Sequence, residues 1–400
     1  MKKILFVINT LGRAGAENSL LELLKHLDPK QYEVSLYVIM GQGELASELP
    51  EHVRLLNKHY RNTPVLGKQG QKGMVKQVLK AMFTRGTLIR RLPYLFKNLF
   101  LMLGKKQISV DKLLWRILSD GGEFQEETYD LAVAYIEGGA TYYVADHVHA
   151  VRKAAFIHVD YQKAGYTKAL DKDCYAKFDK MFAVSQEVKI EFEKFYPQWA
   201  DKTDVFRNIL DVEGIRKRAL EPGGFTDSFD GVRILTIGRL TAQKGLEVSI
   251  EAMALLKRAF FPVRWYVLGE GDQRDFLKKT IEKAGLQEDF ILLGSVDNPY
   301  PYLAQADLYV HASRFEGKSI AIQEAQVLGK AIVVSDRSGN REQVIDREDG
   351  IMCRFHPESI RDAIDLLLHD QELKQRLEKA AALKNEAAEK DLYKLFDLLQ

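Results

Sequence analysis

The sequence predicts an α/β protein made of two doubly wound, parallel-sheet domains. Short apolar runs alternate with amphipathic helical patterns, as expected for βαβ units. The alternation occurs twice, once from the N-terminus and again from near Val205. The length of 400 residues also exceeds the size at which a single hydrophobic core is usual. Two Rossmann-like domains are therefore expected.

The first series defines an N-terminal domain over residues 1–203. Its helix at Glu17–Leu27 repeats leucine at helical spacing, and Ser185 is expected to cap the helix Gln186–Phe195. A basic, amphipathic insertion occupies residues 60–118. The strands of this domain are expected at Lys3–Ile8, Glu33–Ile39, Val53–Leu56, Asp130–Ile136, Lys153–His158 and Lys180–Val184.

The second series defines a C-terminal domain over residues 204–375. Its strands are expected at Val232–Ile237, Val263–Leu268, Phe290–Leu293, Asp307–Val310 and Ala331–Ser335. The helices between them are expected at Leu246–Phe260, Gln273–Ala284, Tyr300–Gln305 and Ser319–Leu328. The chain after His356 has helical patterns throughout, and residues 376–400 are expected to cross back to the N-terminal domain.

Composition narrows the class of protein. Hydrophobic content of 46% and charged content of 28% are typical of a soluble globular protein. The two cysteines, Cys174 and Cys353, lie in no CxxC pair and near no histidine cluster, which argues against a disulfide framework or a structural zinc site. The apolar run at the N-terminus ends too soon for a signal peptide, and no run spans a bilayer. A cytoplasmic protein is expected.

Positive charge is concentrated in one segment. Residues 58–116 contain 14 Lys and Arg and one acid, a charge of +13, which leaves −11 for the rest of a chain whose total is +2. Within residues 70–106 the cations alternate with aromatic and aliphatic residues, a pattern that suits an interfacial helix on an anionic leaflet. Alternatively, the segment is a helical hairpin whose apolar face packs on its own domain. The apolar content argues against nucleic acid as the partner.

Two carboxylates frame the most informative stretch. Glu316 follows the strand that begins at Asp307, and Glu324 lies on the opening turns of the next helix. Ligands of open α/β sheets bind beside the carboxyl ends of strands, and free amides at a helix start favour anionic oxygens. The stretch therefore indicates a site for a phosphorylated, hydroxyl-rich molecule.

Three further groups occur at predicted strand ends. Gly238, Arg239 and Lys244 follow one strand, where Arg and Lys can neutralise a diphosphate. Gly12 to Glu17 form a turn before the first helix that lacks the GxGxxG pattern. His158 ends an apolar run and can bond a sugar hydroxyl. Each group also has a plainer interpretation, as surface charges, a tight turn and a half-buried histidine.

Taken together, these residues resemble the retaining glycosyltransferases of family four, which have the GT-B fold. The resemblance rests on the turn near Gly15, on His158, on Arg239 and Lys244, and on the Glu316–Glu324 pair, in family order over nearly the whole chain. Two positions depart from the family pattern. Lys318 stands where an apolar residue is frequent, and Ala14 replaces one of two paired glycines.

The resemblance implies roles for the matching positions. His158, Glu316, Arg239 and Lys244 would be catalytic. Glu137, Asp160 and Tyr161 are assigned to the acceptor side, and no residue is assigned to a metal. The residues expected to bind the donor, in a cleft between the domains, are Gly15, Gly238, Arg239, Lys244, Glu316, Gly317, Lys318, Ser319 and Glu324.

The expected activity is transfer of a hexose or N-acetylhexosamine from a nucleotide-diphosphate sugar, with UDP as the expected nucleotide. The acceptor would be a glycan or a lipid-linked molecule at the cytoplasmic face of the membrane, and the anomeric configuration would be retained without a cofactor or metal. Two alternatives remain open. One is a GT-B nucleotide-sugar epimerase, and the other is a non-catalytic sugar-nucleotide-binding or membrane-scaffold protein. The sequence does not identify the sugar, the base, the acceptor, the linkage or the oligomeric state.

Overall fold

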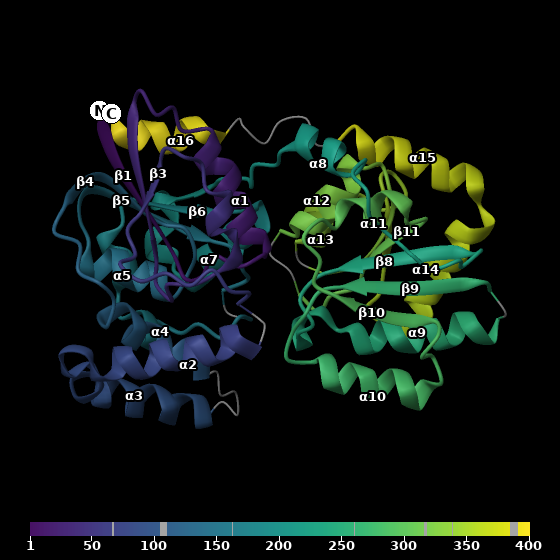
Figure 1. Cartoon of the computed structure of the whole chain (residues 1–400), viewed down its shortest axis with the longest axis horizontal. Helices are drawn as coiled ribbons and strands as arrows, with labels where there is room; N and C mark the ends of the chain where they lie inside the picture. Colours follow the sequence, from purple (N-terminus) through teal and green to yellow (C-terminus); the bar gives the residue numbers. More distant parts are fainter. Residues whose placement is uncertain are drawn as a thin grey trace. The chain divides into compact units, whose positions relative to one another are not determined.

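The chain divides into two compact units, each built around one parallel sheet with helices on both faces (Figure 1). Unit 1 comprises Met1–Ile209 with Glu389–Gln400, and unit 2 comprises Leu210–Ala388. The computed structural model describes residues 1–65, 68–104, 110–161, 163–259, 261–315, 318–337, 339–384 and 391–400.

The sheet of unit 1 has seven strands in the order β3-β2-β1-β4-β5-β6-β7, all paired in parallel. The strands are β1 (Lys2–Ile8), β2 (Tyr32–Val38), β3 (Val53–Leu55), β4 (Thr128–Ala134), β5 (His149–Ile157), β6 (Lys180–Ala183) and β7 (Thr203–Val205). The six expected strands are confirmed. The order reverses between β1 and β4, so the sheet is doubly wound.

Successive side chains of β1 point to opposite faces of the sheet, as in any strand, and are buried in two different cores. Ile4, Phe6 and Ile8 pack with the leucines of α1 and with the C-terminal α16. Leu5 and Val7 pack on the other face with α4, α5 and α7. Ser185 caps α7 as expected, accepting a 3.1 Å hydrogen bond from the Val188 amide. These helices are α1 (Gly15–Lys25), α4 (Val110–Asp120), α5 (Gly139–His147), α7 (Gln186–Phe195) and α16 (Leu392–Phe396).

The sheet of unit 2 has six strands in the order β10-β9-β8-β11-β12-β13, again all parallel. The strands are β8 (Val232–Ile237), β9 (Val263–Leu268), β10 (Phe290–Gly294), β11 (Leu308–His311), β12 (Ala331–Ser335) and β13 (Ile351–Cys353). The five expected strands are confirmed and β13 is an addition. Here the order reverses between β8 and β11.

Helices cover both faces of this second sheet. One face packs against α9, α10 and α14, and the other packs against α11 and α12. Helix α15 contributes Leu373 and Leu377 to the first core and Ala381 to the second. The helices of unit 2 are α8 (Val212–Arg218), α9 (Leu246–Arg258), α10 (Arg274–Ala284), α11 (Tyr300–Gln305), α12 (Ile320–Val327), α13 (Asn340–Gln343), α14 (Pro357–His369) and α15 (Gln371–Ala382).

The division of the chain differs in detail from the sequence expectation. The first unit extends to Ile209 instead of residue 203, because β7 pairs with β6 and completes the first sheet. Helix α15, part of which lies in the segment expected to cross back, packs with α12 and α14 in unit 2. The return to unit 1 is made by α16, whose Leu395 is buried in the same core as the leucines of α1.

The basic insertion forms two helices, α2 (Lys68–Phe83) and α3 (Thr87–Gly104), which pack on α4. Arg91 of α3 donates two hydrogen bonds to Asp120 at the end of α4, at 2.5 and 3.0 Å, and His147 lies 2.9 Å from the same carboxyl group. Burial alone would raise the pKa of Asp120, but the hydrogen bonds from His147 and Arg91 outweigh it and lower this pKa to about 2. Asp120 therefore anchors α3 as a carboxylate.

In the parts of the chain that the structure describes, no helix is both long enough and apolar enough to cross a bilayer.

Candidate functional site

The point where the strand order of unit 2 reverses carries most of the expected donor-site residues. Strands β8 and β11 are neighbours, and each ends at the same edge of the sheet. Three hydrogen bonds join the segments that follow them. The Arg314 amide donates to the Gln243 carbonyl at 2.9 Å, the Gln243 amide group donates to the Phe315 carbonyl at 2.9 Å, and Arg314 Nε donates to the Ala242 carbonyl at 3.1 Å. The two segments therefore form one continuous surface.

Lys244 lies at this surface in a defined position. Its Nζ is 3.3 Å from Nε2 of His311, whose Nδ1 is 3.0 Å from the Tyr309 hydroxyl. An ammonium group only donates, so Nε2 of His311 accepts, and the ring proton resides on Nδ1 and faces Tyr309. The stem of Lys244 covers Gly238, where an added Cβ would lie 3.2 Å from Lys244 Cε. His311 is buried, so it fixes the direction of the Lys244 side chain.

Arg239 is exposed beside Lys244. Its carbonyl accepts a 2.9 Å hydrogen bond from the Thr241 amide, which shapes the turn. Its guanidinium makes no hydrogen bond or ion pair with another residue that the structure describes. Two cations, one fixed and one exposed, thus stand at the end of β8, an arrangement that can bind a diphosphate.

Glu324 is buried in α12, behind the segment that follows β11. Burial raises its pKa, and a 2.9 Å hydrogen bond from the Tyr300 hydroxyl and the charge of Arg218 oppose that rise only in part. Arg218 lies over the Tyr300 ring, 4.8 Å from its centroid. Glu324 is therefore a rigid acceptor for hydroxyl groups.

The remaining residues expected at this edge lie just before α12. Ser319 is the N-cap residue, with extended backbone, and Lys318 precedes it in partly buried surroundings. Glu316 and Gly317 lie outside the described residues. The structure thus brings Gly238, Arg239, Lys244, Lys318 and Ser319 to one edge of unit 2, while Glu324 lies buried on the next helix.

Unit 1 has its own polar group where its strand order reverses. Asn9 follows β1, donates to the Glu137 carbonyl at 3.1 Å and accepts from the Ala140 amide at 2.8 Å. Glu137 follows β4 and is buried, and its carboxylate accepts the His158 amide at 3.0 Å. Asn9 was missed by the sequence analysis, although it directly follows the first strand, as polar site residues of α/β sheets do.

His158 is half-buried, and its Nε2 is shielded from solvent with no hydrogen-bond partner among the residues described. Burial lowers its pKa to about 4, although a hydrogen bond to the Tyr135 backbone acts in the opposite direction. At neutral pH the imidazole is therefore uncharged. It can bond a hydroxyl group, but it does not supply a positive charge.

The other expected residues of unit 1 differ in how accessible they are. Gly15 is exposed as the first residue of α1. Asp160 is buried and holds a local turn through the amide and the ammonium group of Lys163, at 3.1 and 2.6 Å. Tyr161 is fully buried among aromatic rings, and its hydroxyl accepts a 3.1 Å bond from Tyr175. Tyr161, which was expected on the acceptor side, thus lies in the aromatic core of unit 1.

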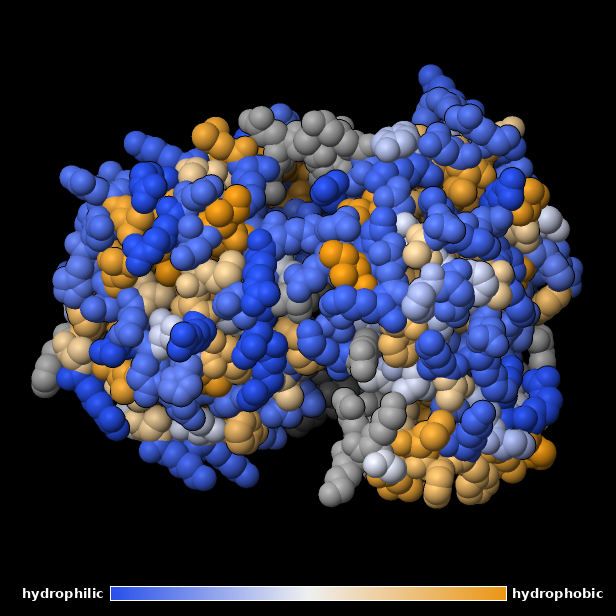
Figure 2. Space-filling model, turned by 180° about the vertical axis from the view of Figure 1, so that it is seen from behind, coloured by the Kyte–Doolittle hydropathy of each residue, from blue (hydrophilic) through white to orange (hydrophobic). Residues whose placement is uncertain are grey.

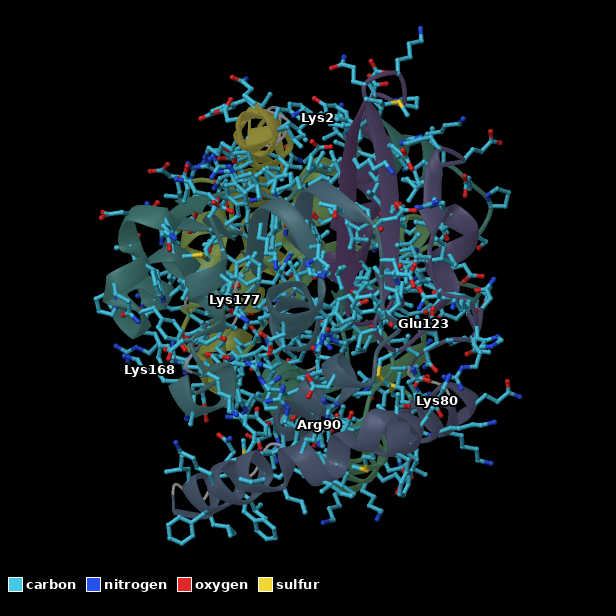
Figure 3. The ribbon with its side chains drawn as sticks, turned by 90° about the vertical axis from the view of Figure 1, so that its left-hand side faces the viewer. Lys2, Lys80, Arg90, Glu123, Lys168 and Lys177 are labelled. Atoms are coloured by element: carbon cyan, nitrogen blue, oxygen red, sulfur yellow. The ribbon has the colours of Figure 1, made fainter. Side chains whose placement is uncertain are left out.

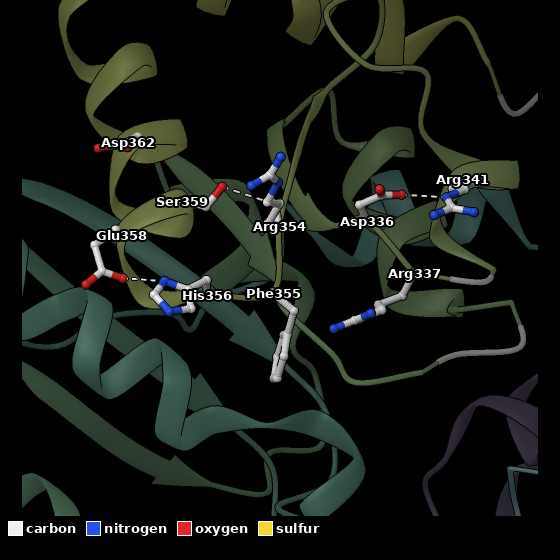
Figure 4. Close-up of a pocket in the computed structure, with 9 residues that line it drawn as sticks. All are labelled: Asp336, Arg337, Arg341, Arg354, Phe355, His356, Glu358, Ser359 and Asp362. Carbon is white, nitrogen blue, oxygen red and sulfur yellow. Dashed lines mark hydrogen bonds and ion pairs between the residues drawn. The ribbon is translucent and has the colours of Figure 1, made fainter.

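A hollow opens next to the Lys244 turn, beyond the ends of β12 and β13 (Figure 4). Phe355 on its wall packs against Gly245, where an added Cβ would lie 2.3 Å from the ring. Its three arginines are balanced by three acids, so its charge does not favour an anion. The hollow is lined by Asp336, Arg337, Arg341, Arg354, Phe355, His356, Glu358, Ser359 and Asp362.

Over the described ranges, no group of three or more His, Cys, Asp and Glu side chains is arranged to hold a metal ion.

Parts of the chain are similar in sequence to known proteins. Residues 229–384 match the family model of glycosyl transferases group 1. The chain is 33% identical over 191 residues to an N-acetylgalactosaminyltransferase that acts on a diphospho-undecaprenol in Campylobacter jejuni, covering 47% of this chain and 50% of that protein. It is 27% identical over 223 residues to the poly(glycerol-phosphate) alpha-glucosyltransferase of Bacillus subtilis, covering 55% and 32%. The chain thus spans half or less of the length of these relatives.

Solved structures resemble the whole chain. Anabaena HepE with UDP and glucose superposes with a TM-score of 0.71 at 18% identity, covering 100% of this chain and 99% of that one. A TarM variant from S. aureus, in complex with UDP, superposes with a TM-score of 0.69 at 13% identity, covering 100% of both chains. The expected GT-B fold is therefore confirmed. The chain resembles the glycosyltransferases that build bacterial glycans.

The turn at Gly269, which follows β9, provides a test of the close packing between this turn and the Gly238 turn after β8. Gly269 has φ +144°, and an added Cβ would lie 2.0 Å from the Gly238 carbonyl oxygen. Gly285, also at positive φ (+67°), has nothing within 4 Å of such a Cβ. We expect Gly269→Ala to lower the free energy of unfolding by about 3 kcal/mol or more, and Gly285→Ala by only about 1 kcal/mol. Equal losses in urea-induced unfolding would show that the two turns do not pack this closely.

Proposed function

We propose that this chain is a retaining glycosyltransferase of family four. It would move a hexose or N-acetylhexosamine from a nucleotide-diphosphate sugar, with UDP as the nucleotide, to a glycan or lipid-linked acceptor. The observation that carries the proposal is the pair Arg239 and Lys244 at the reversal point of the unit 2 sheet, with the buried carboxylate of Glu324 on the adjoining helix. UDP in the HepE and TarM structures and the activities of the relatives support the same class.

In the proposed reaction, the bond between the anomeric carbon and a diphosphate oxygen breaks. The acceptor hydroxyl forms the new bond to that carbon, and its proton passes to the departing diphosphate. Negative charge grows on the diphosphate as the bond breaks, and fixed cations stabilise such charge more in the transition state than in the ground state. Arg239 and Lys244 supply this charge from the chain itself, so the proposal requires no metal ion or cofactor.

The other residues would position the donor. Glu324, held by Tyr300, would accept hydrogen bonds from the ribose hydroxyls. Ser319 and Lys318 lie where the chain enters α12, so their amides would face phosphate or sugar oxygens. Gly15 would offer the start of α1 to the diphosphate. Gly238 would leave room for the donor beside the Lys244 stem. Glu316 and Gly317 keep their expected roles at the donor sugar.

His158 would bond a hydroxyl of the donor sugar as a neutral imidazole. Its unused Nε2 supports this role, because a shielded nitrogen without a partner is costly unless a ligand satisfies it. Glu137 would act indirectly, by holding the His158 backbone through the 3.0 Å bond to its amide. Asp160 would shape the neighbouring turn.

We expect Lys244→Ala and Arg239→Ala each to lower kcat/KM roughly 100- to 1000-fold, the usual effect of removing one group that stabilises developing charge. Lys278→Ala, which removes an exposed cation on α10 of the same unit, serves as the matched control and should stay within about twofold. Release of free nucleotide from UDP-, GDP- and CDP-sugars, with and without a chelator, measures the effect. Variants of Lys244 and Arg239 with wild-type turnover would contradict the assignment of the donor site.

The low pKa of His158 gives a separate test. Because the imidazole is neutral above about pH 5, His158→Asn should lower kcat/KM about tenfold or more, equivalent to one hydrogen bond, without changing the shape of the profile between about pH 5 and 8. Initial rates across that range measure it. An inflection near pH 6.5 in the wild type that disappears in the variant would mean that His158 titrates and acts as an acid or base instead.

A further inference from the structure

Helix α3 has two apolar sides, and only one of them is covered by unit 1. On the inner side, Tyr94 and Met102 pack with Leu113 of α4 and with Leu170. The Tyr94 hydroxyl donates to the Leu170 carbonyl at 3.2 Å. Together with the Arg91–Asp120 ion pair, these contacts fix the inner side of α3 against its unit.

The opposite side of α3 is exposed along its length. Its apolar residues are spaced three, four and seven apart, which places them on one face of a helix. They are between 38 and 77% exposed. We call this set the outer stripe, which consists of Ile89, Leu92, Phe96, Leu99, Phe100 and Leu103.

Helix α2 also exposes apolar side chains, and cations lie among them. Val75, Leu79 and Phe83 are exposed at helical spacing, with Lys76 and Lys80 exposed between them. Figure 2 shows hydrophobic surface gathered at the lower right, where α2 and α3 lie when seen from behind. Figure 3 shows Lys80 and Arg90 on the same pair of helices. The exposed apolar surface is therefore bordered by cations.

The charge of this hairpin is of one sign. Residues 68–104 contain eight Lys and Arg and no Asp or Glu. A second copy of the chain placed on this face would bring two such sets of cations together, which opposes a dimer. A nucleic acid would neutralise the charge but would leave the outer stripe facing phosphates and water. An anionic lipid surface is complementary to both the charge and the outer stripe, because its headgroups attract cations and its acyl region accepts apolar side chains.

We propose that α2 and α3 form a docking surface for an anionic lipid bilayer. Helix α3 lies in the plane of the interface, with the outer stripe at the boundary between headgroups and acyl chains. The cations of α2, with Arg90 and Lys97 of α3, contact the headgroups. The proposal rests on the hairpin alone and does not depend on the transfer reaction. It would place the chain at a membrane surface, where the lipid-linked acceptor of the proposed function would lie.

Flotation of the full chain with vesicles tests the proposal. The wild type should float with phosphatidylcholine vesicles that contain phosphatidylglycerol at low salt, and should be released from them at high salt. It should not float with phosphatidylcholine alone. Phe96→Ser combined with Phe100→Ser should weaken binding at least tenfold, and Lys76→Gln combined with Lys80→Gln should weaken it by a similar factor, because each cation near such a surface contributes several-fold.

Matched variants in unit 2 serve as controls. Phe276→Ser removes an exposed aromatic ring, and Lys278→Gln with Lys279→Gln removes two exposed cations, all on α10. These variants should float like the wild type. All variants should keep the wild-type melting temperature and, where donor hydrolysis is measurable, its rate within about twofold.

Three outcomes would overturn the proposal. The first is no flotation of the wild type at low salt. The second is flotation that the Phe96 and Phe100 variant retains in full. The third is a wild-type dimer in light scattering that this variant converts to a monomer, since the occupant of the face would then be a second copy.

Discussion

The reversal of strand order between β8 and β11 is the constraint on which the candidate site depends. Both strands run the same way, so the segments that follow them emerge at one edge of the sheet. They then lead to helices on opposite faces, α9 on one and α12 on the other. The edge between two such segments stays uncovered, which is why open parallel sheets bind ligands there. In unit 1, β1 and β4 repeat this arrangement, with α1 and α5 on opposite faces.

Within that opening, packing decides where the polar groups lie. The Gly269 turn touches the backbone at Gly238, and the Leu240 amide donates to the Glu270 carbonyl at 2.9 Å. These contacts hold the Gly238 turn against the turn that follows β9. The hydrogen bonds between Arg314 and Gln243, and from Gln243 to Phe315, hold it against the segment that follows β11. Lys244 is then directed by His311. A cation held in this way loses little conformational entropy when an anion binds, which is the physical advantage of a preformed site.

Most strands and helices of the two units could be predicted from the sequence, because long apolar runs and helical spacing report directly on which residues are buried. Strands β3, β7 and β13 have three residues each, and runs this short give only a weak signal; of the three, only β3 was predicted. His311 was missed because the sequence does not show that this histidine lies 3.3 Å from the Nζ of Lys244, which is 67 residues earlier in the chain. Tyr161 follows the polar Asp160 in sequence, and only tertiary packing shows that it is buried among aromatic rings. The orientation of α3 could not be predicted either, because it has apolar residues on both sides and spacing alone does not show which side unit 1 covers.

In the proposed function, Lys244 and Arg239 bind the diphosphate of the donor. The most direct test compares the dissociation constants of UDP and uridine, which differ only in the diphosphate, for the wild type and Lys244→Ala by titration calorimetry. We predict that the wild type prefers UDP and that the variant loses at least about tenfold of this preference while binding uridine as before. An unchanged ratio of the two constants in the variant would contradict the claim.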